Sequence, residues 1–293
     1  MNRNSAHYSF PLGAFTATVV SDGQASFPAW PLYAPNATPT QVDEALTSRF
    51  LPPNYLLQCN VLVLDTGSRR VLFDTGAGAM LGPSLGQLPG RLRAAGVDPD
   101  TITDVLLTHA HLDPVSGLVD ATGAPAFPNA AVRLAEAEWD FWRQADPDLS
   151  ALPLPPEFRQ NFTLAAHRNL LALQERIVPF RFGAEVVPGI AALDARGHSP
   201  GHAAFLLESQ GQRLLHLGDV FHHEAFDLAH PHWATAFDHD VKQAYQTRCR
   251  LLDQAVQERA LVLAYHAPFP AAGHVRVLGQ GYGWEATPWL VQP

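Results

Sequence analysis

The segment His109-Ala110-His111-Leu112-Asp113-Pro114 (HAHLDP) directly follows an apolar run, residues 102–108, that is typical of a buried strand. Chain that leaves the end of a strand often presents side chains into a cleft. Two histidines and a carboxylate at alternate positions converge on one metal ion when the backbone turns sharply, and Pro114 favours such a turn. The segment alone leaves two interpretations open, a metal site or a surface turn with a capping aspartate.

Three later segments favour the metal site. GHSPGH (residues 197–202) is a Gly/Pro-rich loop between predicted strands, and Asp219 and His266 each follow a short apolar run. Thirteen of the 14 histidines lie between His109 and His274, so histidine is concentrated in the same part of the chain. Because strand ends meet along one edge of a sheet, these side chains are expected to lie close together.

The spacing of the strands predicts the fold class. Helical patterns are inserted at intervals and do not separate every pair of strands, which favours an α/β (α+β) fold over a doubly wound parallel sheet. We expect an αββα sandwich of two mixed β-sheets flanked by helices, with residues 1–293 as a single domain. The expected strands cover residues 15–20, 56–64, 71–73, 102–108, 131–134, 190–194, 203–208, 213–217 and 261–265, and the expected helices cover 86–95, 136–145, 153–176 and 241–258.

Composition restricts partners and location. Nineteen basic and 28 acidic residues give a net charge of −9, which argues against nucleic acid or an anionic membrane as a partner. No apolar run is long enough to span a bilayer, and the N-terminal residues lack the apolar segment of a signal peptide. With Cys59 and Cys249 as the only cysteines, we expect a cytoplasmic protein without a cysteine-based zinc site.

The segments HAHLDP, GHSPGH, LGDV and YHAPFP, in this order and with these separations, resemble the metallo-β-lactamase superfamily. The flanking segments LFDTGAG, AFPNAAVR and GQGYGW are similar to the branch that contains methyl parathion hydrolase and the N-acyl-homoserine lactonases. The similarity extends from about Gly13 to Trp284. It implies hydrolysis of a lactone, aryl ester or phosphotriester by metal-bound hydroxide, and homodimers.

The resemblance also implies a set of ligands. One metal would be held by three histidines and a second mainly by carboxylates, with Asp219 bridging the two ions. Asp113 and Asp219 are the candidate catalytic residues, and His198 is expected to support a ligand through a hydrogen bond. Zinc is the expected metal, with iron, manganese or cobalt as alternatives. The implied ligands are His109, His111, His202 and Asp219 for the first ion, and Asp113, Asp219 and His266 for the second.

The chain departs from the family at Pro114. The family motif HxHxDH ends in a histidine that binds the second metal, and proline has no side-chain donor. The first site is therefore expected to bind tightly and the second to be weaker or absent. His222, three residues after Asp219, is the candidate substitute ligand. Alternatively one metal suffices, and Asp113 acts as a general base on water bound to it.

Aromatic residues near the predicted ligands indicate an apolar pocket. The candidates are the segment Phe27 to Tyr33 together with Phe221, Phe226 and Phe269. Such a pocket suits a small neutral ester or acyl lactone. The leading hypothesis is therefore a metal-dependent hydrolase of a lactone or carboxylic ester. Two alternatives are a catalytically silent or sensing member of the family with one metal, and a mononuclear iron redox enzyme.

Overall fold

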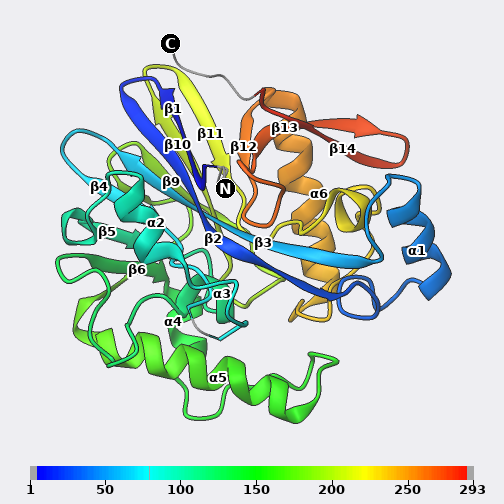
Figure 1. Ribbon diagram of the computed structural model, residues 1–293, viewed down its shortest axis with the longest axis horizontal. Helices are drawn as coiled ribbons and strands as arrows, with labels where there is room; N and C mark the ends of the chain where they lie inside the picture. The colour runs from blue at the N-terminus through cyan, green and yellow to red at the C-terminus, as the bar shows by residue number, and fades with distance from the viewer. Residues whose placement is uncertain (1–4, 79, 289–293) are drawn as a thin grey trace.

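The computed structural model describes residues 5–78 and 80–288, so both ends of the predicted domain 1–293 lie outside the described residues. Two seven-stranded sheets pack face to face, and helices cover their outer surfaces (Figure 1). The αββα sandwich of two mixed sheets is confirmed. Among the described residues, no helix combines the length and apolar character needed to cross a membrane.

The first sheet has the strand order β1-β2-β3-β4-β5-β6-β7. Pairing is antiparallel from β1 to β4 and parallel from β4 to β7. The strands are β1 (His7–Leu12), β2 (Phe15–Pro28), β3 (Asn54–Asp65), β4 (Arg70–Phe73), β5 (Asp104–Leu106), β6 (Ala131–Ala135) and β7 (Ile177–Phe180).

The second sheet has the strand order β14-β13-β12-β11-β10-β9-β8. It is antiparallel except for the β11–β12 pair. The strands are β8 (Glu185–Val187), β9 (Ile190–Asp194), β10 (Ala203–Ser209), β11 (Gln212–His216), β12 (Leu261–Leu263), β13 (Ala272–Leu278) and β14 (Gly281–Ala286).

Three apolar layers hold the sandwich together. Residues such as Leu62, Phe73 and Phe205 fill the space between the sheets. The other two layers lie between the first sheet and α2, α4 and α5, and between the second sheet and α6, which runs beside β12 and β13 in Figure 1. The helices are α1 (Pro39–Thr47), α2 (Leu88–Ala94), α3 (Leu112–Val115), α4 (Glu136–Trp142), α5 (Pro156–Leu170) and α6 (Val241–Glu258), with 3₁₀ turns at Pro99–Thr101 and Leu171–Arg176 and a π-helical turn at Glu224–Leu228.

Strand β2 is longer than expected. The Ser21-Asp22-Gly23 segment reads as a turn, but the chain continues through it with a β-bulge opposite Cys59 and Asn60. Asp22 is buried and accepts hydrogen bonds from the backbone N–H groups of Ala77, Gly86 and Leu88. The aspartate therefore anchors a neighbouring loop and does not end the strand.

Candidate metal centre

Each predicted ligand segment follows the end of a strand. His109 comes after β5, His198 after β9, Asp219 after β11 and His266 after β12, and all four are buried. The turn after β11 needs Gly218, which has a φ of +55°, because a Cβ atom there would lie 2.7 Å from Nε2 of His202. The strand ends of both sheets thus bring these side chains to one edge of the sandwich.

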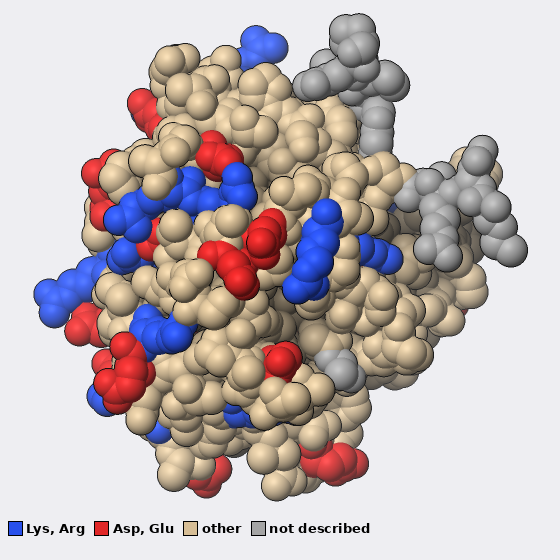
Figure 2. All heavy atoms as spheres, turned by 60° about the vertical axis from the view of Figure 1, so that its left-hand side comes forward, with Lys and Arg blue, Asp and Glu red and all other residues tan. Residues whose placement is uncertain are grey.

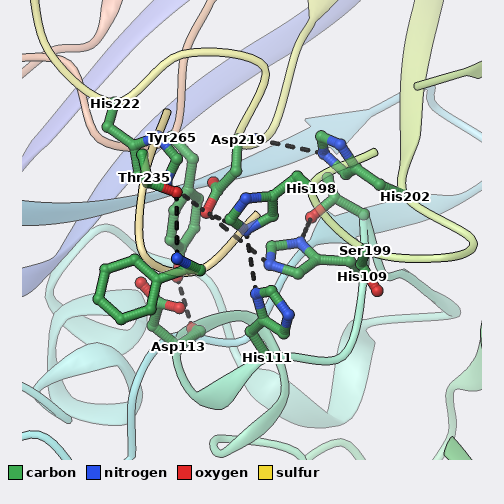
Figure 3. Close-up of polar contacts among 12 residues, drawn as sticks. His109, His111, Asp113, His198, Ser199, His202, Asp219, His222, Thr235 and Tyr265 are labelled. Atoms are coloured by element: carbon green, nitrogen blue, oxygen red, sulfur yellow. Dashed lines mark hydrogen bonds and ion pairs between the residues drawn. The ribbon is translucent and has the colours of Figure 1, made fainter. Parts of the chain in front are cut away.

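Asp219 lies at the centre of the cluster. Its Oδ2 atom is 3.2 Å from Nε2 of His266, 3.4 Å from Nε2 of His198 and 3.8 Å from Nε2 of His109. Nδ1 of His111 lies 2.9 Å from Nε2 of His198. In Figure 3 the rings of His109, His111 and His198 gather on one side of Asp219. Four imidazoles and one carboxylate therefore converge in a buried space.

Hydrogen bonds behind the rings determine which nitrogen faces the cluster. Nδ1 of His266 donates to the carbonyl of Gln58 at 2.7 Å, and Nδ1 of His198 lies 2.9 Å from Oδ1 of Asp238. Nδ1 of His109 lies 2.9 Å from the hydroxyl oxygen of Thr108, whose own proton goes to the Asp74 carboxylate. In each neutral ring the lone pair is then on Nε2, directed at Asp219, as in metal-binding histidines supported by a hydrogen-bond acceptor.

A divalent cation fits this donor set. Among the described residues, the buried Nε2 of His109 and Oδ1 of Asp219 have no hydrogen-bond partner. Unpaired buried polar atoms are costly, and a cation among the rings would satisfy both. His109, His111 and His198 each offer one nitrogen within 4.8 Å of the other two. Three imidazoles and a carboxylate are typical ligands of zinc.

The structure exchanges the roles expected for the two histidines of GHSPGH. His202 was expected to bind metal, but its Nδ1 donates to the Ala195 carbonyl at 2.9 Å and its Nε2 accepts the Asp219 N–H at 3.2 Å. Both nitrogens are therefore occupied, and Figure 3 shows the second contact as a dashed line. His198, expected as the support, is the residue that faces His109 and His111. The geometry thus contradicts the expected assignment of both residues.

The second group of donors surrounds Asp113. Its Oδ2 atom lies 3.2 Å from Nε2 of His266 and 3.7 Å from Sγ of Cys59. These three residues form a further set that could hold a metal ion. We expected that cysteine would take no part in a metal site, but Cys59 lies within one of these groups. His222, the candidate substitute, has Nε2 3.5 Å from Oδ2 of Asp219 and forms a donor group with Asp219 and His198.

The charge states of the cluster follow from burial and neighbours. In the absence of a cation, burial raises the pKa of Asp113, although His266 opposes this shift. Burial disfavours the charged form of His222, but Asp219 and Asp227 outweigh it and raise the pKa of His222 to about 10. Burial lowers the pKa of His109 well below its usual value, which leaves it a neutral ligand. Burial also opposes the charged form of His266, but Asp219 and Asp113 raise its pKa, so a cation must displace a proton there and metal affinity should fall in acid.

Two buried residues support the metal centre although neither belongs to a recognisable sequence motif. Glu138 of α4 is fully buried and accepts hydrogen bonds from the N–H groups of Ala110 and Gly201 and from Ser199, so it joins the HAHLDP and GHSPGH segments. Arg248 of α6 is also buried, with Nη2 3.8 Å from Asp227 and 3.6 Å from Asp238. These aspartates hold His222 and His198, respectively. Both supports are distant in sequence from the ligands, which is why pattern reasoning misses them.

An apolar pocket opens onto the cluster. As expected, the segment Phe27 to Tyr33 contributes to its wall. The three other predicted aromatics do not line it: Phe221 packs in the α6 layer, Phe226 in the layer outside the first sheet, and Phe269 against the layer between the sheets. The apolar lining residues are Phe27, Leu32, Tyr33, Leu57, Leu81, Leu112, Phe158, Phe162 and Phe237, and the floor is formed by His111, Asp113, His198, Asp219, His222 and His266.

Charged residues of both signs lie close together on the face shown in Figure 2, and much of that face is uncharged. Not every charge of the protein is on the surface: the buried Asp104 is paired with Arg133 at 2.7 Å and with Arg69 at 2.8 Å. The metal-binding candidates are instead buried beneath the apolar pocket.

The family model of the metallo-beta-lactamase superfamily matches residues 54–262. The chain therefore belongs to this superfamily. An N-acyl homoserine lactonase of Bacillus sp is 25% identical over 177 residues, which are 60% of each chain. A probable metallo-hydrolase of Mycobacterium tuberculosis is 28% identical over 191 residues, which are 57% of this chain and 58% of that protein. The matches thus span less than two thirds of these relatives.

Solved structures match over almost the whole chain. AidC, a dizinc quorum-quenching lactonase, has a TM-score of 0.92 at 25% identity, covering 98% of this chain and 99% of that one. AbOPH, a hydrolase in the beta lactamase superfamily, has a TM-score of 0.89 at 26% identity, covering 99% and 100% of the two chains. The fold that carries the buried histidines is thus shared with a lactonase and a hydrolase of known structure.

Proposed function

We propose that this protein hydrolyses a neutral lactone or carboxylic ester that carries an apolar acyl chain, with zinc as its metal. One observation carries the proposal: the floor of an apolar pocket is the buried cluster of histidines and aspartates. Apolar walls favour an uncharged substrate, and convergent polar groups at the floor would orient its reacting carbonyl. AidC, which has a similar fold, was solved with the product N-hexnoyl-L-homoserine, and this supports an acyl lactone as the substrate class.

The chain's own residues would position the reaction. A divalent metal supplies Lewis acidity, which lowers the pKa of a water molecule and polarises a carbonyl oxygen. His109, His111, His198 and Asp219 would hold the first ion. Asp113 lies at the pocket floor, where its carboxylate would hold a second ion or, with one metal bound, accept a proton from the attacking water. The apolar wall formed by Phe162 and Phe237 would exclude bulk water from the acyl chain.

A substrate panel tests this proposal. Zinc-loaded protein should hydrolyse N-hexanoyl-homoserine lactone or an aryl hexanoate with a kcat/KM at least about tenfold higher than for a phosphotriester of similar size. The acyl chain fits the apolar wall, whereas the phosphoryl group adds polar oxygens that the wall leaves unpaired. A preference for the phosphotriester would contradict the substrate class.

Pro114 favours a second candidate, a catalytically silent or sensing protein, because a family ligand is missing there. The variant Pro114→His distinguishes an active hydrolase from a catalytically silent protein. If the native protein is an active hydrolase, the variant should change turnover of the panel substrates by less than about tenfold. A large gain in hydrolysis together with the gain of a metal ion would support the silent alternative.

A further inference from the structure

Cys59 occupies an unusual position beside the metal centre. It is fully buried in β3, and its neighbours tie that strand to the segment that carries His266. The carbonyl of Gln58 accepts from Nδ1 of His266, and Nδ2 of Asn60 donates to the carbonyls of Tyr265 and Ala267. The β-bulge in β2 lies opposite Cys59 and Asn60, and bulges commonly redirect side chains at functional sites. The thiol is thus held in place from two sides.

The distances around the thiol match a metal site. Tetrahedral zinc with bonds of about 2.0 Å to oxygen or nitrogen and about 2.3 Å to sulfur has ligand separations of about 3.3 Å and about 3.5 Å. In the structure Sγ of Cys59 lies 3.7 Å from Oδ2 of Asp113, which lies 3.2 Å from Nε2 of His266. That nitrogen is in turn 3.2 Å from Oδ2 of Asp219. The donor atoms of Cys59, Asp113 and His266 all lie within 4.8 Å of one another, and Asp219 adjoins this group through its contact with His266.

Two further observations point to a ligand at this position. Oδ1 of Asp219 is buried and has no hydrogen-bond partner among the described residues. Nδ1 of His266 donates to the carbonyl of Gln58, so Nε2 is the nitrogen that faces the oxygens of two carboxylates. Lone pairs at such distances repel one another unless a cation or a proton lies among them. The family resemblance implies a histidine ligand at position 114, and the proline there offers no nitrogen to this set of donors.

We propose that Cys59 binds a second metal ion as a thiolate, with Asp113, Asp219 and His266, and so replaces the histidine that is missing at position 114. The thiol proton is released to solvent when the sulfur–metal bond forms, so the step needs no oxidant or co-reactant. A thiolate is a strong zinc ligand. The second site then has four protein donors, which removes the reason to expect it to be weak or absent. The inference rests on the metal-dependent function proposed above.

Cobalt substitution tests the thiolate directly. Metal-free protein titrated with Co²⁺ should bind two ions and develop a thiolate-to-cobalt charge-transfer absorption in the near ultraviolet. Cys59→Ser and Cys59→Ala should lack this band and lose at least about tenfold in affinity for one of the two ions. Cys249→Ser is the matched control, because Cys249 is the only other cysteine of the chain and it should leave both the band and the stoichiometry unchanged.

Two more variants test whether Cys59 or another side chain binds the second ion. His222→Ala should keep the band, because His222 forms its donor group with His198 and Asp219 and not with Cys59. Pro114→His combined with Cys59→Ala should restore the second ion without the band. Absence of the band in the native protein at saturating cobalt, or its survival in Cys59→Ala, would overturn the inference. These readouts do not depend on turnover, so they remain decisive even if the substrate proposal fails.

Discussion

At the scale of single residues, the acceptor behind each histidine decides its role. His198 and His202 stand four positions apart in one loop, and the letters GHSPGH do not show which ring faces the metal centre. His202 directly precedes β10, where the Ala195 carbonyl and the Asp219 N–H occupy both of its nitrogens. His198 lies in the loop itself and is held by Asp238. The histidines could be predicted from sequence, but their division into ligand and support required the fold.

Glu138→Gln tests the support of the metal centre. The amide has one acceptor oxygen where the carboxylate has two, so some of the buried donors from Ala110, Ser199 and Gly201 lose their partner. We expect unfolding free energy to fall by about 2 kcal/mol and zinc affinity to fall about 10- to 100-fold. Chemical denaturation and a competitive chelator titration measure the two effects.

The control for that variant is Glu136→Gln on the same helix, where the side chain is about half exposed and paired with Arg181. Its unfolding free energy and zinc affinity should match the native values. Equal effects of the two variants would show that Glu138 has no special role.

His216→Leu tests a buried histidine that has no role in the metal centre. His216 is fully buried against Phe73, and neither ring nitrogen has a hydrogen-bond partner among the described residues. Burial lowers its pKa to about 3. The unfolded chain takes up a proton at this residue below about pH 6.5, whereas the folded chain does not, so stability falls as the pH drops below that value.

This single group should cost about 2 kcal/mol of stability between about pH 7 and pH 5. The leucine variant should therefore lose about that much less than the native protein over the same range, as measured by urea denaturation at each pH. Parallel stability curves would show that His216 is protonated or paired in the folded state.

At the scale of elements, the helix α5 forms one wall of the pocket. Phe158 and Phe162 of α5 line the pocket, and Phe158 is 42% exposed, which places it where a substrate could still cover it. The amphipathic pattern of residues 153–176 predicts a helix there, and the structure has α5 followed by a 3₁₀ turn. Its function as a pocket wall could not be predicted, because the residues it faces are far away in sequence.

Phe158→Ala should weaken substrate binding by about 1 kcal/mol, or about fivefold in KM, for lactones or esters with long acyl chains. Short-chain substrates, which do not reach the helix, should be almost unaffected. Leu164→Ala is the control, since Leu164 is exposed on the same helix and does not line the pocket. A KM that changes equally for short and long chains would contradict the placement of the acyl chain along α5.

At the scale of the whole molecule, the sandwich architecture follows from strand spacing, yet several elements leave little trace in the sequence. β1 contains Pro11, and the hairpin of β13 and β14 contains several glycines and exposes Val277 and Leu278. Neither has the regular alternation that marks a half-buried strand. Tertiary pairing at the edges of the sheets therefore specifies these strands, whereas the central strands are specified by their own apolar residues.

The arrangement of the two sheets explains why the location of the metal centre could be predicted from sequence. A sandwich brings the ends of β5, β9, β11 and β12 to one edge, so residues that end strands must meet there. What could not be predicted was the contribution of Cys59, which lies in the middle of β3 and not at a strand end. Its closeness to Asp113 arises from the contacts between β3 and the segment after β12.

We expect the buried cluster to bind metal and, through it, to support hydrolysis. The most direct test measures metal content and hydrolysis of N-hexanoyl-homoserine lactone on one preparation, first after chelation and then during stepwise addition of zinc. We predict that the metal-free protein is folded and inactive, and that activity returns in proportion to the zinc bound. Undiminished hydrolysis by protein without metal, or failure of the chelated, folded protein to bind zinc, would show that the cluster is not the metal centre of a hydrolase.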